Sequence, residues 1–171
     1  IINYFKKKDF DFFDVRKPVV AAKDNKNLYR TLDTHWNANG AYEAYRGFCQ
    51  VTYATLGLTP FNISDFQIKY NDSYEGDLTN QLGVKSIYGY KDNLPTYDLI
   101  DKTKLYKTVV REGFPKGTII TQNDSSPKKQ KVLIFRDSFT TALVQFISLH
   151  YKEVIYINGI YDQIIRYMLS M

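Results

Sequence analysis

The chain has 171 residues, of which 44% are hydrophobic and 24% are charged, and its formal net charge is +5. This balance is typical of a globular domain and excludes a disordered chain. No apolar run approaches the roughly 18 residues that a membrane-spanning helix needs, and the single cysteine, Cys49, excludes an intramolecular disulfide. We expect one domain over residues 1–171, and a fragment of a longer chain because no initiator methionine opens it.

The first part of the chain predicts a connector, a strand and a long helix. "VVAAK", residues 19–23, indicates a connector or one helical turn, and "NLYRTL", residues 27–32, alternates like a strand that ends at Asp33. From residue 38 to residue 56, apolar side chains recur at steps of three and four before Gly57 ends the pattern. Asn37 or Asn39 can cap this helix, because a short polar side chain satisfies the free N–H groups of the first turn.

Residues 60–131 indicate an inserted β-rich lobe. Short β-type runs alternate there with Asn, Asp, Gly and Pro, which favours hairpins. The runs are "DFQIKY" (65–70), "KSIYGY" (85–90), "KLYKTVV" (104–110) and "GTIITQ" (117–122).

The last section predicts a strand, a turn, a helix and a second strand. These are "KVLIF" (131–135), "RDS" (136–138), "FTTALVQFISLHY" (139–151) and "KEVIYIN" (152–158). Such a βαβ unit has two parallel strands and a right-handed crossover. The fold class that we expect is therefore α/β, with a partly parallel sheet flanked by helices.

Ser138 lies where the predicted strand turns into the predicted helix. In α/β proteins, binding and active sites lie at the carboxyl ends of the parallel strands. The first N–H groups of the helix can also stabilise an oxyanion on an acyl group bonded to this serine. A plain N-cap serine or aspartate is the structural alternative. A serine nucleophile needs a base, and His150 lies at the far end of the same predicted helix. His35 is therefore the candidate base.

Asp33 stands two residues before His35, close enough to accept a hydrogen bond from one ring nitrogen and hold the other toward a hydroxyl. We expect both residues to end a strand and open a helix, and so to share a sheet edge with Ser138. Two separated histidines and one cysteine do not make a typical zinc set, so we expect no metal and no cofactor.

Three blocks carry a resemblance to a known family. "DTHWNANGA" (33–41), "EGDLTNQLG" (75–83) and "VLIFRDSFTTALVQFISLHYKEVIYIN" (132–158) resemble the SGNH-hydrolase-like proteins grouped with the alginate O-acetyltransferases and the DHHW proteins. The Asp-His block precedes the serine block, as in the circularly permuted alginate-type arrangement. The resemblance implies Ser138 as nucleophile, His35 as general base, Asp33 as its orienting partner, and an acetyl-serine intermediate.

The function that we expect is an O-acetyltransferase or O-acetylesterase acting on an extracytoplasmic polysaccharide, in the periplasm, at the cell surface or as a secreted protein. Its partners would be the polysaccharide and an acetyl donor, possibly delivered by a membrane protein, and not nucleic acid. The alternative is an inactive SGNH scaffold that binds a glycan or serves in assembly.

For several other residues a purely structural role is the alternative to a functional one. Trp36, Asn37 and Arg136 are the candidates for substrate binding, although Trp36 more often packs to fix a loop and Arg136 more often pairs with Asp137. Asp77 is expected to cap or turn its own segment. The basic cluster "PKKQK", residues 127–131, is more often a solvated turn that leads into a strand than a phosphate-binding patch.

Overall fold

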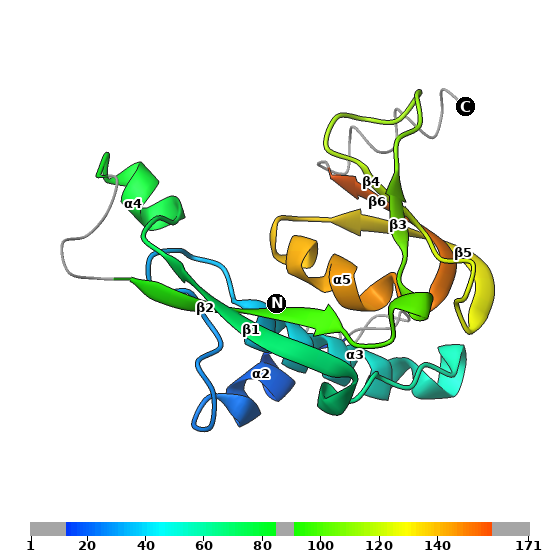
Figure 1. Cartoon of the computed structure of the whole chain (residues 1–171), viewed down its shortest axis with the longest axis horizontal. Helices are drawn as coiled ribbons and strands as arrows, with labels where there is room; N and C mark the ends of the chain where they lie inside the picture. Colours follow the sequence, from blue (N-terminus) through cyan, green and yellow to red (C-terminus); the bar gives the residue numbers. More distant parts are fainter. Residues whose placement is uncertain (1–12, 85–90, 159–171) are drawn as a thin grey trace, which may run out of the picture. The chain divides into compact units, whose positions relative to one another are not determined.

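The structure is a computed structural model that describes residues 13–84 and 91–158 (Figure 1). The organisation as one domain over residues 1–171 stays a prediction. By their contacts the residues group into two compact units, called here the first unit and the second unit. The first unit comprises Ile1–Asn62 and Tyr70–Thr96, and the second unit comprises Ile63–Lys69 and Tyr97–Met171.

The helices in the described part of the first unit are α2 (Arg16–Ala22), α3 (Ala38–Leu56) and α4 (Asp77–Gln81). The prediction of α3 is confirmed at both ends. The Asn37 side chain accepts hydrogen bonds from the backbone N–H groups of Asn39 and Gly40, and Gly57 ends the helix with a φ of 60°, a left-handed conformation that glycine adopts without steric cost. The buried face of α3 includes Ala41, Tyr42, Ala44, Tyr45 and Cys49.

The prediction of a strand at residues 27–32 is wrong, because this segment is a loop. One isolated antiparallel bridge joins Tyr29 to Trp36, and the buried carboxylate of Asp92 accepts hydrogen bonds from the backbone N–H groups of Thr31 and Leu32 at 2.8–3.0 Å. A side chain therefore satisfies the N–H groups that a neighbouring strand would otherwise pair.

In its described residues, the predicted β-rich region contains four complete strands, which divide between two sheets, and the start of a fifth. β1 (Phe66–Ser73) pairs with β2 (Asp92–Leu99) in a two-stranded sheet. β3 (Lys107–Val109) and β4 (Ile119–Gln122) pair with each other and extend the main sheet of the second unit. The expected run at residues 85–90 lies outside the described residues.

The main sheet confirms the predicted α/β class. Its strand order is β3-β4-β6-β5. β5 (Lys128–Arg136) and β6 (Tyr151–Asn158) are parallel, with Val132 opposite Val154 and Phe135 opposite Ile157, whereas β4 is antiparallel to β6. The sheet is therefore mixed, as expected for a partly parallel sheet.

The helix between β5 and β6 is shorter than the predicted one. Residues 139–147 form a 3₁₀ segment, η3 (Phe139–Leu143), and one turn of α-helix, α5 (Val144–Ile147), and residues 148–150 are a turn before β6. Ser148 follows α5, and its buried hydroxyl lies within 2.8–2.9 Å of the hydroxyls of Thr121 and Tyr156. Phe146 of α5 packs edge-on against Phe66 and Tyr97, which anchors α5 in the core of the second unit.

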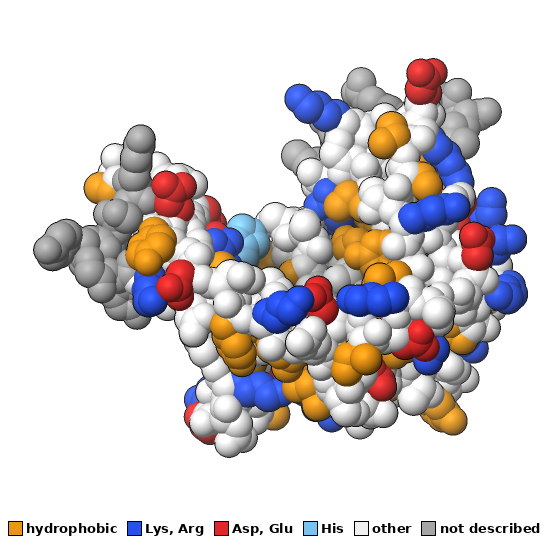
Figure 2. All heavy atoms as spheres, viewed as in Figure 1, with side chains coloured by type: hydrophobic (Ala, Val, Ile, Leu, Met, Phe, Trp, Pro, Cys, Tyr) orange, Lys and Arg blue, Asp and Glu red, His pale blue; other side chains and the backbone are white. Residues whose placement is uncertain are grey.

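Among the described residues, none of the helices combines the length and the apolar character that crossing a bilayer requires. Figure 2 shows basic and acidic side chains interspersed over the visible face. The "PKKQK" cluster follows this pattern, because Lys131 lies 3.4 Å from the Glu153 carboxylate and Lys129 donates to the carbonyls of Asp124 and Ser126. The predicted turn is wrong for most of the cluster, because residues 128–131 already belong to β5 (Lys128–Arg136).

Candidate active site

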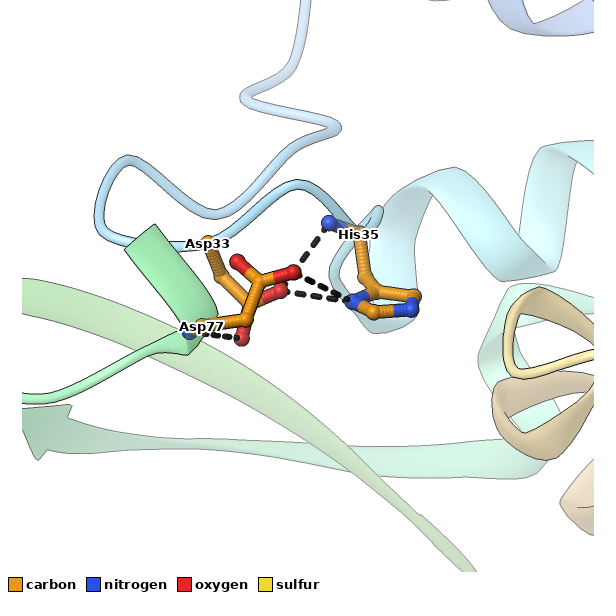
Figure 3. Close-up of side chains that lie close together, drawn as sticks. All are labelled: Asp33, His35 and Asp77. Carbon is orange, nitrogen blue, oxygen red and sulfur yellow. Dashed lines mark hydrogen bonds and ion pairs between the residues drawn. The ribbon is translucent and has the colours of Figure 1, made fainter. Parts of the chain in front are cut away.

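His35 and Asp33 form a hydrogen-bonded pair on the loop that precedes α3 (Figure 3). Asp33 Oδ1 lies 2.6 Å from His35 Nδ1 and accepts the backbone N–H of His35 at 3.0 Å. Because a carboxylate can only accept, the neutral ring carries its proton on Nδ1 and has its lone pair on Nε2. The pair thus has the tautomer that a general base requires.

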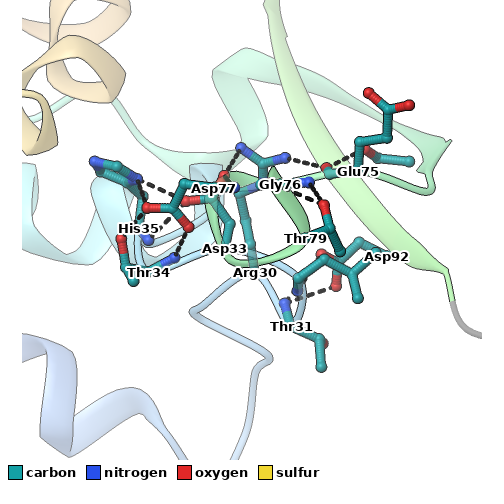
Figure 4. Close-up of polar contacts among 12 residues, drawn as sticks. Arg30, Thr31, Asp33, Thr34, His35, Glu75, Gly76, Asp77, Thr79 and Asp92 are labelled. Atoms are coloured by element: carbon teal, nitrogen blue, oxygen red, sulfur yellow. Dashed lines mark hydrogen bonds and ion pairs between the residues drawn. The ribbon is translucent and has the colours of Figure 1, made fainter. Parts of the chain in front are cut away.

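The Asp33 carboxylate is buried yet stays charged. Burial alone would raise its pKa, but hydrogen bonds from the side chain and backbone of His35, together with the charge of Arg30, outweigh burial and lower the pKa. Arg30 Nη1 lies 2.6 Å from Asp33 Oδ2, and its Nη2 donates to the carbonyl of Glu75 at 3.0 Å. Arg30 therefore joins the carboxylate to the segment that leads into α4 (Figure 4).

Asp77, the first residue of α4, contacts the same loop from the other side. Its carboxylate accepts the backbone N–H of Thr34 at 2.7 Å and the Thr34 hydroxyl, and its Oδ2 lies 3.6 Å from His35 Nδ1. Its own backbone N–H donates to Asp33 Oδ2 at 3.3 Å. The sequence predicts only a cap or turn for Asp77, because no spacing rule places residue 77 beside residues 33–35.

The three groups Asp33, His35 and Asp77 offer ligand atoms that all lie within 4.8 Å of one another. Each carboxylate already accepts hydrogen bonds from protein donors, namely His35, Thr34 and the backbone of Asp77. These donors account for the cluster, so it carries no argument for a bound cation.

Gly76 lets α4 approach the loop closely. A Cβ at this position would lie 2.1 Å from the carbonyl oxygen of Leu32 and 2.9 Å from Cβ of Asp33. The backbone N–H of Leu78 donates to the same Leu32 carbonyl at 3.2 Å. A side chain at residue 76 would therefore push α4 away from Asp33.

Gly76→Ala is expected to lower the free energy of unfolding by about 3 kcal/mol, the upper end of overpacking costs, because the crowding atoms belong to the backbone. Chemical denaturation followed by circular dichroism measures this loss. Gly83→Ala is the control, since its Cβ meets no atom within 4 Å and only its φ of 69° is unfavourable. A Gly76→Ala protein as stable as the wild type would contradict the close approach.

Ser138 stands between β5 and η3 in the second unit, and it is exposed. It occupies the N-cap position of η3, but the capping hydrogen bonds among the described residues come from Asp137 Oδ1, which accepts the backbone N–H and the hydroxyl of Thr140 at 3.1 Å each. Of the structural alternative, an N-cap serine or aspartate, the structure shows the aspartate. The cap belongs to Asp137.

Arg136 is anchored within the second unit. It donates from Nη1 to the Thr141 hydroxyl at 2.9 Å and from Nη2 to the carbonyl of Gly117 at 2.8 Å. Its contact with Asp137 is to the backbone carbonyl, at 3.3 Å, and not to the carboxylate. These bonds fix the turn that carries Ser138, whereas substrate binding by Arg136 stays a prediction.

The other predicted residues have the following places. Trp36 is 7% exposed, and the Asn37 amide is engaged by the α3 cap and by the carbonyl of Asn27, so both residues hold the loop, and their contact with substrate stays a prediction. His150 is not at a helix end but is buried in the turn before β6. Asp33 and His35 lie on a loop and not at a strand end. Asp33 and His35 belong to the first unit and Ser138 to the second. That the three residues form a triad stays a prediction.

Comparisons with known proteins identify relatives of the chain. A family described as SGNH hydrolase-like domain, acetyltransferase AlgX, matches residues 1–109. A DHHW family protein from Eubacterium siraeum has 16% identity and a TM-score of 0.66, over 85% of this chain and 55% of that chain. PatB1 from Bacillus cereus has 16% identity and a TM-score of 0.64, over 92% of this chain and 64% of that chain. The chain thus spans less than two thirds of either structure, and no curated protein matches it.

Proposed function

Because the chain belongs to the family of SGNH hydrolase-like domains of the acetyltransferase AlgX, we propose that it transfers acetyl groups to or from hydroxyls of an extracytoplasmic polysaccharide. The observation that carries the proposal is the short hydrogen bond between Asp33 and His35 Nδ1. This bond prepares Nε2 as a base, which a serine hydroxyl needs before it can attack an acyl group. Ser138 is exposed, and Asp137 rather than Ser138 caps η3. Both observations support the role of Ser138 as that nucleophile.

In the proposed reaction, His35 Nε2 takes the proton of Ser138 while Oγ attacks the acetyl carbonyl of the donor. The tetrahedral intermediate collapses, and His35 returns the proton to the leaving group, so that acetyl-Ser138 remains. A sugar hydroxyl then attacks this ester, and His35 takes its proton and passes it to Ser138. Attack by water instead gives acetate and makes the same site an esterase.

Asp33 stabilises the imidazolium that exists between the two proton transfers, since its carboxylate stays charged. The N–H groups at the start of η3 are the proposed donors to the oxyanion. We assign Trp36, Asn37 and Arg136 to the surroundings of the sugar, with the first two holding the loop of His35. The acetyl donor would reach the site from a membrane partner.

The test is formation of an acyl or sulfonyl adduct on Ser138. We expect p-nitrophenyl acetate to acetylate this residue and a sulfonyl fluoride to block it, as detected by mass spectrometry of the intact protein and its peptides. A PatB1 structure with a sulfonyl adduct supports the choice of the second reagent. Ser138→Ala should abolish the adduct, and Ser125→Ala, at an exposed serine elsewhere in the second unit, should leave it unchanged.

Glycan binding by a wild-type protein that neither turns over nor forms an adduct would overturn the catalytic proposal. That outcome would establish the inactive scaffold instead. An adduct that persists in Ser138→Ala would assign the nucleophile to another residue.

A further inference from the structure

We infer that Asp77 is a second carboxylate that positions His35, so that the start of α4 is part of the active site. This inference rests on the function proposed above. It extends the site from one segment, residues 33–37, to a second one that lies about forty residues further along the chain. The geometry that supports it lies entirely within the first unit.

Two reciprocal hydrogen bonds lock the segments together. The backbone N–H of Asp77 donates to the Asp33 carboxylate, and the backbone N–H of Thr34 donates to the Asp77 carboxylate at 2.7 Å. The Thr34 hydroxyl also donates to Asp77 Oδ2. Thr34 therefore fixes the rotamer of Asp77, and Asp77 fixes the loop residue that stands between Asp33 and His35.

The locked carboxylate faces the catalytic ring. Asp77 Oδ2 lies 3.6 Å from His35 Nδ1, whereas Asp33 Oδ1 lies 2.6 Å from it. The longer distance exceeds hydrogen-bond length, but the attraction between charges falls only slowly with distance. Asp33 thus supplies the hydrogen bond, and Asp77 supplies a second negative charge when His35 becomes an imidazolium.

The decisive variant is Asp77→Asn. An asparagine can still accept the Thr34 N–H, so the lock is kept, but its amide carries no charge toward His35. We expect kcat to fall roughly tenfold, a change that corresponds to 1.36 kcal/mol in the barrier, with KM and the melting temperature unchanged. A merely structural role for Asp77 predicts wild-type kcat in this variant.

Two further variants separate charge from structure. Thr34→Val removes the hydroxyl contact and keeps the backbone lock, so kcat should fall less than in Asp77→Asn. Asp72→Asn is the matched control, because it removes an exposed carboxylate of the same unit that pairs with Lys91. This control should leave kcat unchanged.

A readout that needs no turnover distinguishes this inference from the proposed function. Nitrogen-15 NMR of the His35 ring reports how fast the Nδ1 proton exchanges with water, and we expect severalfold faster exchange in Asp77→Asn than in the wild type. An inactive wild-type protein with this difference would overturn the proposed function and keep the positioning role. Wild-type exchange and wild-type kcat in Asp77→Asn would overturn the role of Asp77.

Discussion

Asp33→Asn is expected to keep the fold and to lower turnover of p-nitrophenyl acetate by about 10⁴-fold, because an amide at this position favours the wrong histidine tautomer. The Asn side chain can present its NH₂ group to Nδ1, which then loses its proton, so that Nε2 is protonated and no longer a base. Steady-state kinetics measures the loss, and circular dichroism verifies the fold. Asn37, and not Asp33, caps α3, so a capping role cannot mask the effect.

Arg30→Met is the matched control for Asp33→Asn. Both variants break the ion pair between Arg30 and Asp33, but Arg30→Met keeps the hydrogen bond from His35 to Asp33. Turnover in Arg30→Met should therefore stay well above that of Asp33→Asn. Full activity of Asp33→Asn beside an inactive His35→Ala would leave a Ser-His pair and remove Asp33 from the site.

The sequence predicted the elements whose signals are local. α3 was predicted at its observed bounds because Asn37 and Gly57 mark its ends and its apolar side chains have the helical period. The parallel pairing of β5 and β6 followed from the βαβ order. In the site, the spacing of Asp33 and His35 was enough to predict their hydrogen bond, since two residues of loop suffice to close it.

Two failures in secondary structure involve partners that come from far along the chain. Asp92 satisfies the N–H groups of Thr31 and Leu32, so the segment 27–32 needs no neighbouring strand. Tyr151 begins β6, which pairs with β4 and β5, so the helix that the periodicity extends to residue 151 is shorter. No local pattern encodes either partner.

The site predicted from the sequence lacked two residues, because no local pattern places them beside His35. Asp77 contacts the Asp33–His35 pair from α4. Arg30 contacts it from the start of the loop. The "EGDLTNQLG" block was the one available signal for Asp77. It marked the segment as part of the resemblance but gave no contact, because the close approach depends on Gly76 lying against the Leu32 carbonyl.

Acidification from pH 6.5 to pH 4 is expected to lower the free energy of unfolding by about 3 kcal/mol through His150 alone. Burial, together with the charge of Lys128, lowers the pKa of His150 from 6.5 to about 4. The unfolded chain therefore binds a proton at His150 at a higher pH than the folded protein does. Stability is complete above the unfolded pKa and is lost as the pH falls toward the folded one.

Urea denaturation at a series of pH values measures this slope, which is steepest for His150 in the upper part of the range from pH 6.5 to pH 4. The carboxyl of Glu153, with its pKa lowered from 4.5 to about 2 by hydrogen bonds from Arg111 and Gln122, adds to the loss as the pH approaches 4.5. His150→Gln, which cannot titrate, should flatten the slope. An unchanged slope in His150→Gln would show that the imidazole is solvated in the folded protein, contrary to its burial in the turn before β6.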